Sequence, residues 1–297
     1  MKKIFYMIAL GIGLAGCSNN EDELLSTGSF PEDHVIRIIT EVNEPLSRAG
    51  YDVTNLERFG LMIRNSENAA YNYHKQMVSS GNAWSTSDGQ QMLWDAERTP
   101  VTMIAYAPYM SEAAPDASLA VNALTNQTTE ENVKSSDFLL MKATVDPEQD
   151  LTADGKLKIS LSHAMSKLLI KITVNGTTDA AMNKLGDMSI NGAVVNGICD
   201  LSATVPIVVP APDAVVATVA PYKGTESCEC ILPPQKIAEG FSVNFSYDGK
   251  LYIWTAKEAI ELEKGVEHTL TLNVNTTVRL AAKMARNWAT GQLIDRN

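Results

Sequence analysis

Short hydrophobic runs that alternate with polar residues recur along most of the chain, and this period of two predicts β-strands. The first clear example is the segment 34–42, in which Ile36, Ile38, Thr40 and Val42 fall on one side. Successive side chains of a strand point to opposite faces, so these four residues are expected to face a core together. The segment is therefore predicted to be a half-buried strand at the start of the globular part.

Similar patterns predict strands in both halves of the chain. They lie at 59–63, 100–109, 138–142, 188–190, 198–201, 241–247, 251–254, 268–274 and 278–284. A pair of strands with long loops is expected within 64–90, and a long loop or a short helix within 110–135. The pairs Asn191-Gly192, Asn196-Gly197 and Asp248-Gly249 are predicted to be hairpin turns, because these residue types tolerate a positive φ.

The segment 157–174 is the longest strand-like run, and it exceeds the usual strand length of about five or six residues. We interpret it as two strands, or as one strand that bends between two cores, and therefore place a domain junction there. The whole pattern predicts an all-β fold of two β-sandwiches in series, with about seven short strands in each. The predicted domains are 34–160 and 161–297.

The composition is that of a globular protein, because 45% of the 297 residues are hydrophobic and 20% are charged. The formal net charge is −11, which argues against a nucleic acid partner, since phosphate binding requires a basic patch. The sequence has no Gly-rich phosphate loop, HExxH motif or GxSxG motif. It therefore predicts no catalytic site, no cofactor and no metal site.

The N-terminal residues form a targeting segment rather than part of the fold. Two lysines precede the apolar run 4–14, which is too short to span a bilayer as a helix. The sequence Leu14-Ala15-Gly16-Cys17 then resembles a bacterial lipobox, which implies that residues 1–16 are a signal peptide and that Cys17 carries acyl chains. The alternative is a plain secretory signal with a chance cysteine. Residues 17–33 are predicted to be a solvated acidic tether.

A candidate proteolytic site follows the first predicted strand. Pro45 ends that strand, and Arg48 stands beside the small residues Ala49 and Gly50, in a polar stretch that a trypsin-like protease could reach. On the local pattern alone, the alternative is an ordinary first strand followed by a loop arginine.

The remaining cysteines are Cys199, Cys228 and Cys230. Cys228 and Cys230 are two residues apart in a predicted strand, which separates them by about 7 Å and prevents a disulfide between them. One of them could pair with Cys199, and three small buried thiols are at least as consistent with the pattern. The four histidines are scattered along the chain, which does not favour a metal site.

Few other side chains suggest chemistry. Asp137 and Glu148 could be paired carboxylates, but such pairs arise by chance among 35 acidic residues, so two solvated side chains are the preferred interpretation. His163 lies in a predicted strand, and no neighbour in the sequence completes a catalytic triad. We therefore predict that His163 is a hydrogen-bonded structural histidine.

Several segments carry a resemblance to a known family. They are the lipobox with its acidic tether, Ser47-Arg48-Ala49, and the segments 104–109, 163–168, 232–235, 249–254 and 262–270. Together and in this order they resemble the fimbrillin family, which comprises the lipoprotein type V pilins and Mfa-like fimbrial subunits of Gram-negative anaerobes. The resemblance extends over nearly the whole chain.

This resemblance implies a structural or accessory subunit of cell-surface fimbriae that supports adhesion and has two transthyretin-like β-sandwich domains. The subunit would reach the outer membrane as a lipoprotein and would meet a maturation protease that cuts between Arg48 and Ala49. The strand within 34–48, with Ile36, Ile38, Thr40 and Val42 as the residues that plug the core, would then leave.

A donor strand from another subunit would fill the groove that remains. The family resemblance places this donor in the C-terminal segment 276–297, with Val278, Leu280, Ala282 and Met284 as the alternating residues. Such β-strand addition between subunits builds a head-to-tail polymer.

Two alternatives belong to other functional classes. A surface glycan-binding lipoprotein would require Trp84, Trp94 and Trp254 to form an exposed, coplanar platform. A hydrolase would require a cleft with two carboxylates about 5–9.5 Å apart, which nothing in the sequence indicates.

Overall fold

The computed structural model describes residues 29–43, 50–52, 54–81, 83–175, 178–274, 280–286 and 293–295, the last two ranges by their backbone. Within these residues the structure is almost entirely β, as predicted. The helices of the described residues are α1 (Glu130–Ser135) and the two 3-10 turns η1 (Ala69–Tyr71) and η2 (Met182–Lys184).

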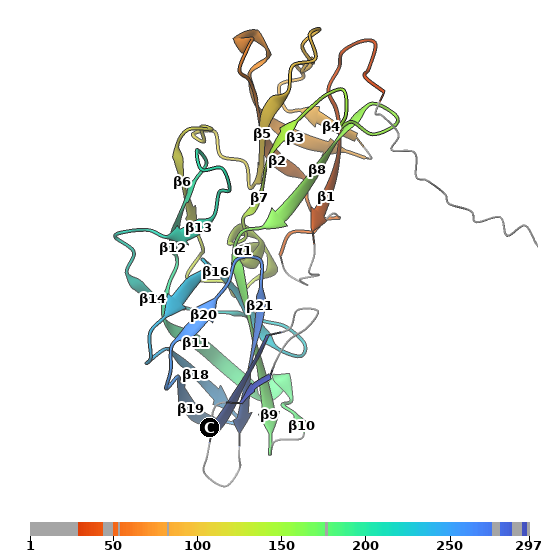
Figure 1. Cartoon of the computed structure of the whole chain (residues 1–297). Helices are drawn as coiled ribbons and strands as arrows, with labels where there is room; N and C mark the ends of the chain where they lie inside the picture. Colours follow the sequence, from red (N-terminus) through yellow and green to blue (C-terminus); the bar gives the residue numbers. More distant parts are fainter. Residues whose placement is uncertain are drawn as a thin grey trace, which may run out of the picture.

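The first half of the chain forms a seven-stranded sheet in the order β1-β8-β7-β5-β2-β3-β4 (Figure 1). Its strands are β1 (Arg37–Asn43), β2 (Arg58–Asn65), β3 (Tyr73–Ser80), β4 (Ala83–Thr86), β5 (Val101–Ala107), β7 (Leu139–Val145) and β8 (Lys156–His163). The strand β1 runs parallel to β8, whereas the other neighbours in this sheet are antiparallel.

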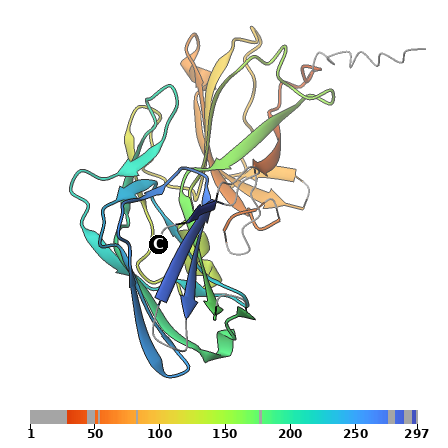
Figure 2. The same ribbon diagram turned by 60° about the horizontal axis from the view of Figure 1, so that its bottom comes forward.

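The second half of the chain contains two main sheets, which lie at the opposite end of an elongated molecule from the first sheet (Figures 1 and 2). One has the order β15-β16-β9-β21-β22-β23, with β10 paired to β9. Its strands are β9 (Ser166–Val174), β10 (Thr178–Asp179), β15 (Tyr222–Lys223), β16 (Cys228–Leu232), β21 (Glu267–Val274), β22 (Leu280–Arg286) and β23 (Leu293–Asp295). The other has the order β14-β11-β18-β19, from β11 (Leu185–Val194), β14 (Val216–Val219), β18 (Ser242–Tyr247) and β19 (Lys250–Thr255).

Two small sheets complete the described structure. The strand β6 (Ser118–Asn122) from the first half pairs with β12 (Asn196–Asp200), which also pairs with β13 (Val208–Pro210). The strand β17 (Gln235–Ile237) pairs with β20 (Ile260–Leu262). The sheet β13-β12-β6 therefore joins the two halves of the chain through backbone hydrogen bonds.

The apolar interior consists of two clusters of buried side chains. One lies within the first sheet and includes Phe59, Leu61 and Trp94. The other fills the second half, but it also contains Met62 and Tyr106 from the opposite face of the first sheet. The second core therefore extends across the junction between the two halves.

The predicted division of the segment 157–174 into two strands is confirmed. The first of them, β8, belongs to the first sheet, and the second, β9, belongs to a sheet of the second half. Ala164, in the short link between them, donates its backbone N–H to the carbonyl oxygen of Phe138 at 2.8 Å. The chain thus changes from one sheet to another at this point.

Two of the three predicted Asn-Gly and Asp-Gly hairpin turns are wrong. Gly192 lies inside β11 with a φ of 99°, where the register with β14 shifts, so it forms a bulge. Gly197 lies inside β12, where an added Cβ would be 2.8 Å from the carbonyl oxygen of Val121. Asp248 and Gly249 do form the predicted turn between β18 and β19, with φ values of 51° and 77°.

The segment 110–135 contains more regular structure than predicted. It includes the helix α1, which the sequence allowed, and also the strand β6, which it did not indicate clearly. The pattern of buried Leu119 and Val121 between exposed neighbours is regular but only five residues long. This strand is stabilised by its pairing with β12, far away in the sequence, and a local pattern cannot show such a partner.

Candidate functional site

The first strand, β1, lies at one end of the first sheet and contributes one face to its core. Ile36, Ile38 and Val42 are only 7%, 5% and 9% exposed, and Thr40 between them is half-buried. Their side chains join the apolar cluster of the first sheet. Burying each large aliphatic side chain contributes about 1.5–3 kcal/mol, so the three together contribute about 5–9 kcal/mol to holding β1 in place.

The polar contacts between β1 and β8 are modest. Lys158 Nζ lies 2.8 Å from Glu41 Oε2, and the hydroxyl of Ser160 also donates to Glu41. These hydrogen bonds lower the pKa of Glu41 below its ordinary value. Because both members of the ion pair are about half exposed, it contributes little free energy. The parallel ladder and the apolar face therefore provide most of the binding of β1.

The other side of β1 is covered by residues from the region of β4. The indole Nε1 of Trp84 donates to Thr40 Oγ1 at 3.1 Å, and the Trp84 ring packs edge-on against Phe59. Just before β1, the backbone N–H of Trp94 donates to the carbonyl oxygen of His34 at 2.7 Å. The strand β1 thus lies between β8 on one side and the β4 region on the other.

The chain after β1 passes through residues 44–49, which lie outside the described part of the structure. This segment contains Arg48 and Ala49, and the predicted lipidation residue Cys17 also lies outside the described residues. The proteolytic and lipidation roles of these residues remain predictions. The described chain resumes at Gly50, and the side chains around this point form the best-defined polar cluster near β1.

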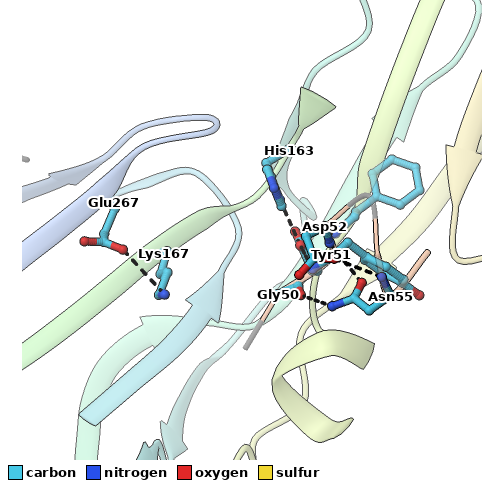
Figure 3. Close-up of polar contacts among 9 residues, drawn as sticks. Gly50, Tyr51, Asp52, Asn55, His163, Lys167 and Glu267 are labelled. Atoms are coloured by element: carbon cyan, nitrogen blue, oxygen red, sulfur yellow. Dashed lines mark hydrogen bonds and ion pairs between the residues drawn. The ribbon is translucent and has the colours of Figure 1, made fainter. Parts of the chain in front are cut away.

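We call this cluster the anchor; it comprises Gly50, Tyr51, Asn55 and His163, which are labelled in Figure 3, together with Asp137. The backbone N–H of Tyr51 donates to Asp137 Oδ2 at 3.1 Å, and His163 Nδ1 lies 2.8 Å from the same oxygen. Asn55 Nδ2 donates to the carbonyl oxygen of Gly50 at 2.9 Å. The anchor therefore attaches the chain just after the predicted cut site to the ends of β7 and β8.

Gly50, Tyr51 and Asp137 of the anchor are buried, and Asn55 and His163 are partly buried, which strengthens the polar contacts among them. Burial, followed by the negative charges of Asp137 and Glu131, raises the pKa of Tyr51 to about 12. Lys134 of α1 lies with Nζ 5.2 Å from the centre of the Tyr51 ring and donates to the carbonyl oxygen of Asn55 at 2.9 Å. None of these contacts involves a residue of β1.

The sequence predicted part of the anchor. His163 is a hydrogen-bonded structural histidine, as expected. Asp137 is not a solvated surface residue, because it is buried and bonded to His163 and Tyr51. Glu148 does not pair with Asp137 but with Arg98, at 3.1 Å. Asp137 and His163 are 26 residues apart, and no sequence motif links them.

The predicted donor segment begins outside the described residues, since Val278 lies in the undescribed range 275–279. The other three donor residues lie in β22, which pairs antiparallel with β21 of the same chain. Their register positions are opposite buried residues of β21, with Leu280 opposite Val274, Ala282 opposite Leu272 and Met284 opposite Leu270. The predicted plug and donor residues therefore belong to different sheets and do not meet within one chain.

The paired end of β21 and β22 contains a buried titratable group, His268. Its Nε2 accepts a hydrogen bond from the backbone N–H of Glu263 at 3.0 Å, and Arg286 is its register partner in β22. Burial lowers the pKa of His268 to about 4, although the negative charge of Glu261 opposes this shift. The neutral imidazole, which can accept this bond, is therefore the form that the fold stabilises.

We expect this histidine to make the protein less stable in mild acid. The pKa of His268 in the folded chain is below the ordinary value of 6.5, so its contribution is complete above about pH 6.5. That contribution decreases as the pH falls towards 4, because protons bind preferentially to the unfolded chain. Urea unfolding between pH 7 and pH 4 measures the effect. His268→Gln should flatten the pH profile relative to the unaltered chain; equal slopes in the two proteins would contradict the assignment.

The tryptophans do not form the exposed platform that a glycan-binding surface would require. Trp94 is buried, and Trp84 packs against the core of the first sheet. Trp254 packs edge-on against Phe241 in the second core, with ring centres 6.1 Å apart. The condition set by the glycan-binding alternative is thus not met by these three side chains.

The three described cysteines are free and buried. The sequence left open either a disulfide to Cys199 or three buried thiols, and the structure has three buried thiols. Burial raises the pKa of Cys199 to about 11 and that of Cys228 to about 12, which suppresses the reactive thiolate form. In the part of the chain that the structure describes, no helix is both long and apolar enough to cross a membrane.

Comparison with known proteins identifies the family. The fimbrillin-like family model matches residues 47–287, so the chain belongs to the fimbrillin-like family. No curated protein matches the sequence.

Similar solved structures support the fold. A candidate cell adhesion protein from Bacteroides ovatus has a TM-score of 0.63 and 17% identity, covering 89% of this chain and 99% of that one. One from Bacteroides uniformis has a TM-score of 0.62 and 16% identity, covering 84% and 97%. A fimbrial protein from Bacteroides ovatus has a TM-score of 0.52 and 16% identity, covering 88% of this chain and 54% of the other. At these identities the similarity establishes a shared fold.

Proposed function

We propose that this chain is a structural or accessory subunit of cell-surface fimbriae and is assembled by protease-triggered donor-strand exchange. The observation that carries the proposal is the position of β1, which fills a core with one face and continues directly into the segment 44–49. A cut after Arg48 would leave β1 bound only by non-covalent contacts. The family membership and the names of the similar structures, which refer to fimbriae and cell adhesion, are consistent with this role.

Before the cut, the chain is a lipoprotein of the outer membrane. Signal peptidase II removes residues 1–16, and acyl chains on Cys17 hold the protein at the cell surface through the acidic tether. The two halves of the chain act as two transthyretin-like β-sandwich domains in series, divided near residue 160. The strand β1 keeps the monomer closed during export, because it covers an apolar groove that would otherwise promote aggregation.

Removal of β1 opens this groove, and the C-terminal segment 276–297 of another subunit fills it. The entering segment must provide both a new ladder with β8 and apolar side chains for the positions of Ile36, Ile38 and Val42. The alternating residues Leu280, Ala282 and Met284 have the spacing that this requires. The anchor keeps Gly50 and Tyr51 at the end of the groove during the exchange.

The donor segment must also leave its own sheet. In the monomer, β22 pairs with β21 and with the three-residue strand β23, so it lies near the end of the sheet. Its release exposes one side of β21 but leaves the pairing of β21 with β9 intact. Both partners of the exchange therefore come from the end of a sheet or from near it, so the ladders between the remaining strands can stay paired.

The N-terminal sequence of the protein recovered from the cell surface tests this proposal. We expect a new N-terminus at Ala49 in polymers, and we expect Arg48→Ala to prevent both the cut and polymer formation. Arg58→Ala is the matched control, because Arg58 is an exposed residue that begins β2. Polymers whose subunits still contain residues 34–48 would exclude strand exchange.

A further inference from the structure

The strand β19 presents an unusual apolar surface at the edge of its sheet. Leu251 is 86% exposed and Ile253 is 68% exposed, although both lie in the middle of a regular strand. The alternate residues Tyr252 and Trp254 face inward, and Tyr252 stacks on Phe245 with ring centres 5.4 Å apart. The inner face of β19 is thus fixed by packing, whereas its outer face leaves two large aliphatic side chains in water.

One side of the β19 backbone has no strand partner among the described residues. Ala256 donates its N–H to the carbonyl oxygen of Phe241 at 2.8 Å, so these two residues are a hydrogen-bonded pair. Counting along the ladder from this pair, Trp254 and Tyr252 are hydrogen-bonded to β18, whereas Ile253 and Leu251 are not. Bonded and non-bonded pairs alternate in an antiparallel ladder, so the backbone groups of Leu251 and Ile253 point away from β18. Among the described strands, none pairs with this edge, because the sheet order ends at β19.

This edge lacks the usual protection against pairing. Exposed edges are normally guarded by proline, by several charges or by a bulge. The edge strand β13 has Pro210, and β1 has charged side chains at Arg37 and Glu41. The strand β19 has no proline, no bulge against β18, and a single charged residue, Lys250. An apolar and unguarded edge of this kind is a template for another strand.

We infer that β19 is a self-association site, which pairs antiparallel with β19 of a second copy of this chain. The reason is that its sequence is complementary to itself about Tyr252. A two-fold axis at Tyr252 places Leu251 opposite Ile253 of the second copy, so the four exposed aliphatic side chains meet on one face. The same axis places Lys250 opposite Trp254 of the second copy, where a cation–π contact is favourable. No like charges come into opposition.

The register also satisfies the backbone. Leu251 of one copy and Ile253 of the second copy become a hydrogen-bonded pair, because the N–H and C=O groups of both residues point to the free edge. The two-fold axis repeats this pair, and the two four-stranded sheets join into one continuous sheet. An unrelated extended peptide would satisfy the backbone as well, but it would match the side chains only by chance.

The size of the surface predicts weak pairing between monomers. A six-residue strand is well below the roughly 800 Å² per partner of a stable interface. Many such contacts along two polymers would add through multivalency, so the site would join fibres side by side. Pairing of monomers does not require strand exchange, and the site can therefore be tested whether or not the proposed function holds.

Cysteine cross-linking tests the register directly. In the full chain carrying Cys17→Ser, Leu251→Cys protein is mixed with Ile253→Cys protein and oxidised mildly. A bonded antiparallel pair has its Cα atoms about 5.5 Å apart, which suits a disulfide. Two copies of either variant alone place their cysteines about 8 Å apart, which is too far. We expect the mixture to give about tenfold more dimer than either variant alone.

A mixture of Val205→Cys and Val215→Cys proteins controls for random collisions, because these residues are also about 70% exposed. Dimer yields in the test mixture no higher than in this control would overturn the inference. Equal yields from Leu251→Cys alone would exclude the register and would overturn it too. As a second measure, Ile253→Lys should abolish the concentration-dependent sedimentation of the otherwise unaltered chain, with its thermal unfolding unchanged; persistent association would count against β19 as the site.

Discussion

A disulfide that joins position 41 of β1 to position 160 of β8 is expected to abolish polymer formation, and a reductant is expected to restore it. Glu41 and Ser160 are direct neighbours in the parallel ladder, so their Cα atoms are about 4.8 Å apart. This separation is within the range that a disulfide accepts. With the link in place, a cut after Arg48 frees one end of β1, but the strand still covers the groove and excludes a donor.

The variant carries Glu41→Cys and Ser160→Cys, and polymers are scored by electron microscopy and by gels run without reductant. The matched control joins β2 to β3 through Arg58→Cys and Val78→Cys, which are also ladder neighbours in this sheet but leave β1 free. The control should polymerise at the level of the unaltered chain, with and without reductant. Normal polymerisation with the link between positions 41 and 160 intact would refute strand exchange at this site.

The prediction rests on a near equality between two binding free energies, that of β1 in the groove and that of the donor strand. The departing strand takes with it about 5–9 kcal/mol of apolar burial from Ile36, Ile38 and Val42. A donor strand would have to recover a similar amount, so exchange between non-covalent partners would proceed with little net cost in free energy. A covalent link removes this balance, because the departing strand can then rebind far more often than a donor can enter.

The strand pattern of this protein is largely readable from the sequence because it depends on local alternation. The face of β1 that contains Ile36, Ile38 and Val42 was predictable, since three apolar residues at a period of two have one common face in a strand. The hairpin at Asp248-Gly249 was predictable for the same local reason. At Gly192 and Gly197, however, the glycine serves a bulge and a close backbone approach, and sequence does not distinguish these uses from a turn.

The candidate site itself was harder to predict, because its contacts are between distant residues. The parallel partner of β1 is β8, which follows it by about 119 positions along the chain. The anchor brings Tyr51 to Asp137 across 86 positions. Nothing near Asp137 indicates that its carboxylate would accept a backbone N–H from the segment after the predicted cut site. The sequence therefore predicted a strand and a cut site, but not the contacts that hold the chain just after that site.

The second large effect concerns a buried ion pair in the sheet β16-β9-β21. Lys167 Nζ lies 2.6 Å from Glu229 Oε2 and 3.4 Å from Glu267 Oε2, and Figure 3 shows Lys167 with Glu267. The side chains of Lys167 and Glu229 are only 9% and 7% exposed. Lys167→Met is expected to destabilise the protein by about 3–5 kcal/mol, because it leaves buried carboxylates without this positive charge.

Removal of both partners should cost much less than removal of one. Glu229 Oε1 is buried without a hydrogen-bond partner in the described structure, so the wild-type pair already includes an uncompensated polar atom. In Lys167→Met with Glu229→Leu, the charges of this pair and this atom are gone, and apolar side chains of similar volume take their place. Glu267 also loses its contact with Lys167, but its side chain is 18% exposed and keeps access to water. We expect the double variant to recover most of the stability lost in Lys167→Met, which appears as a coupling energy in a double-mutant cycle.

Urea unfolding at neutral pH provides the measurement, and Lys158→Met is the matched control. Lys158 forms an ion pair of similar length with Glu41, but the side chains there are 52% and 41% exposed. Loss of that pair should cost at most about 1 kcal/mol, because water replaces the lost contacts at an exposed site. If Lys167→Met and Lys158→Met lowered the free energy of unfolding equally little, the prediction would be wrong, and water would have to reach the ion pair of Lys167 and Glu229. Burial, rather than the length of the ion pair, is thus the property that determines the difference between these two lysines.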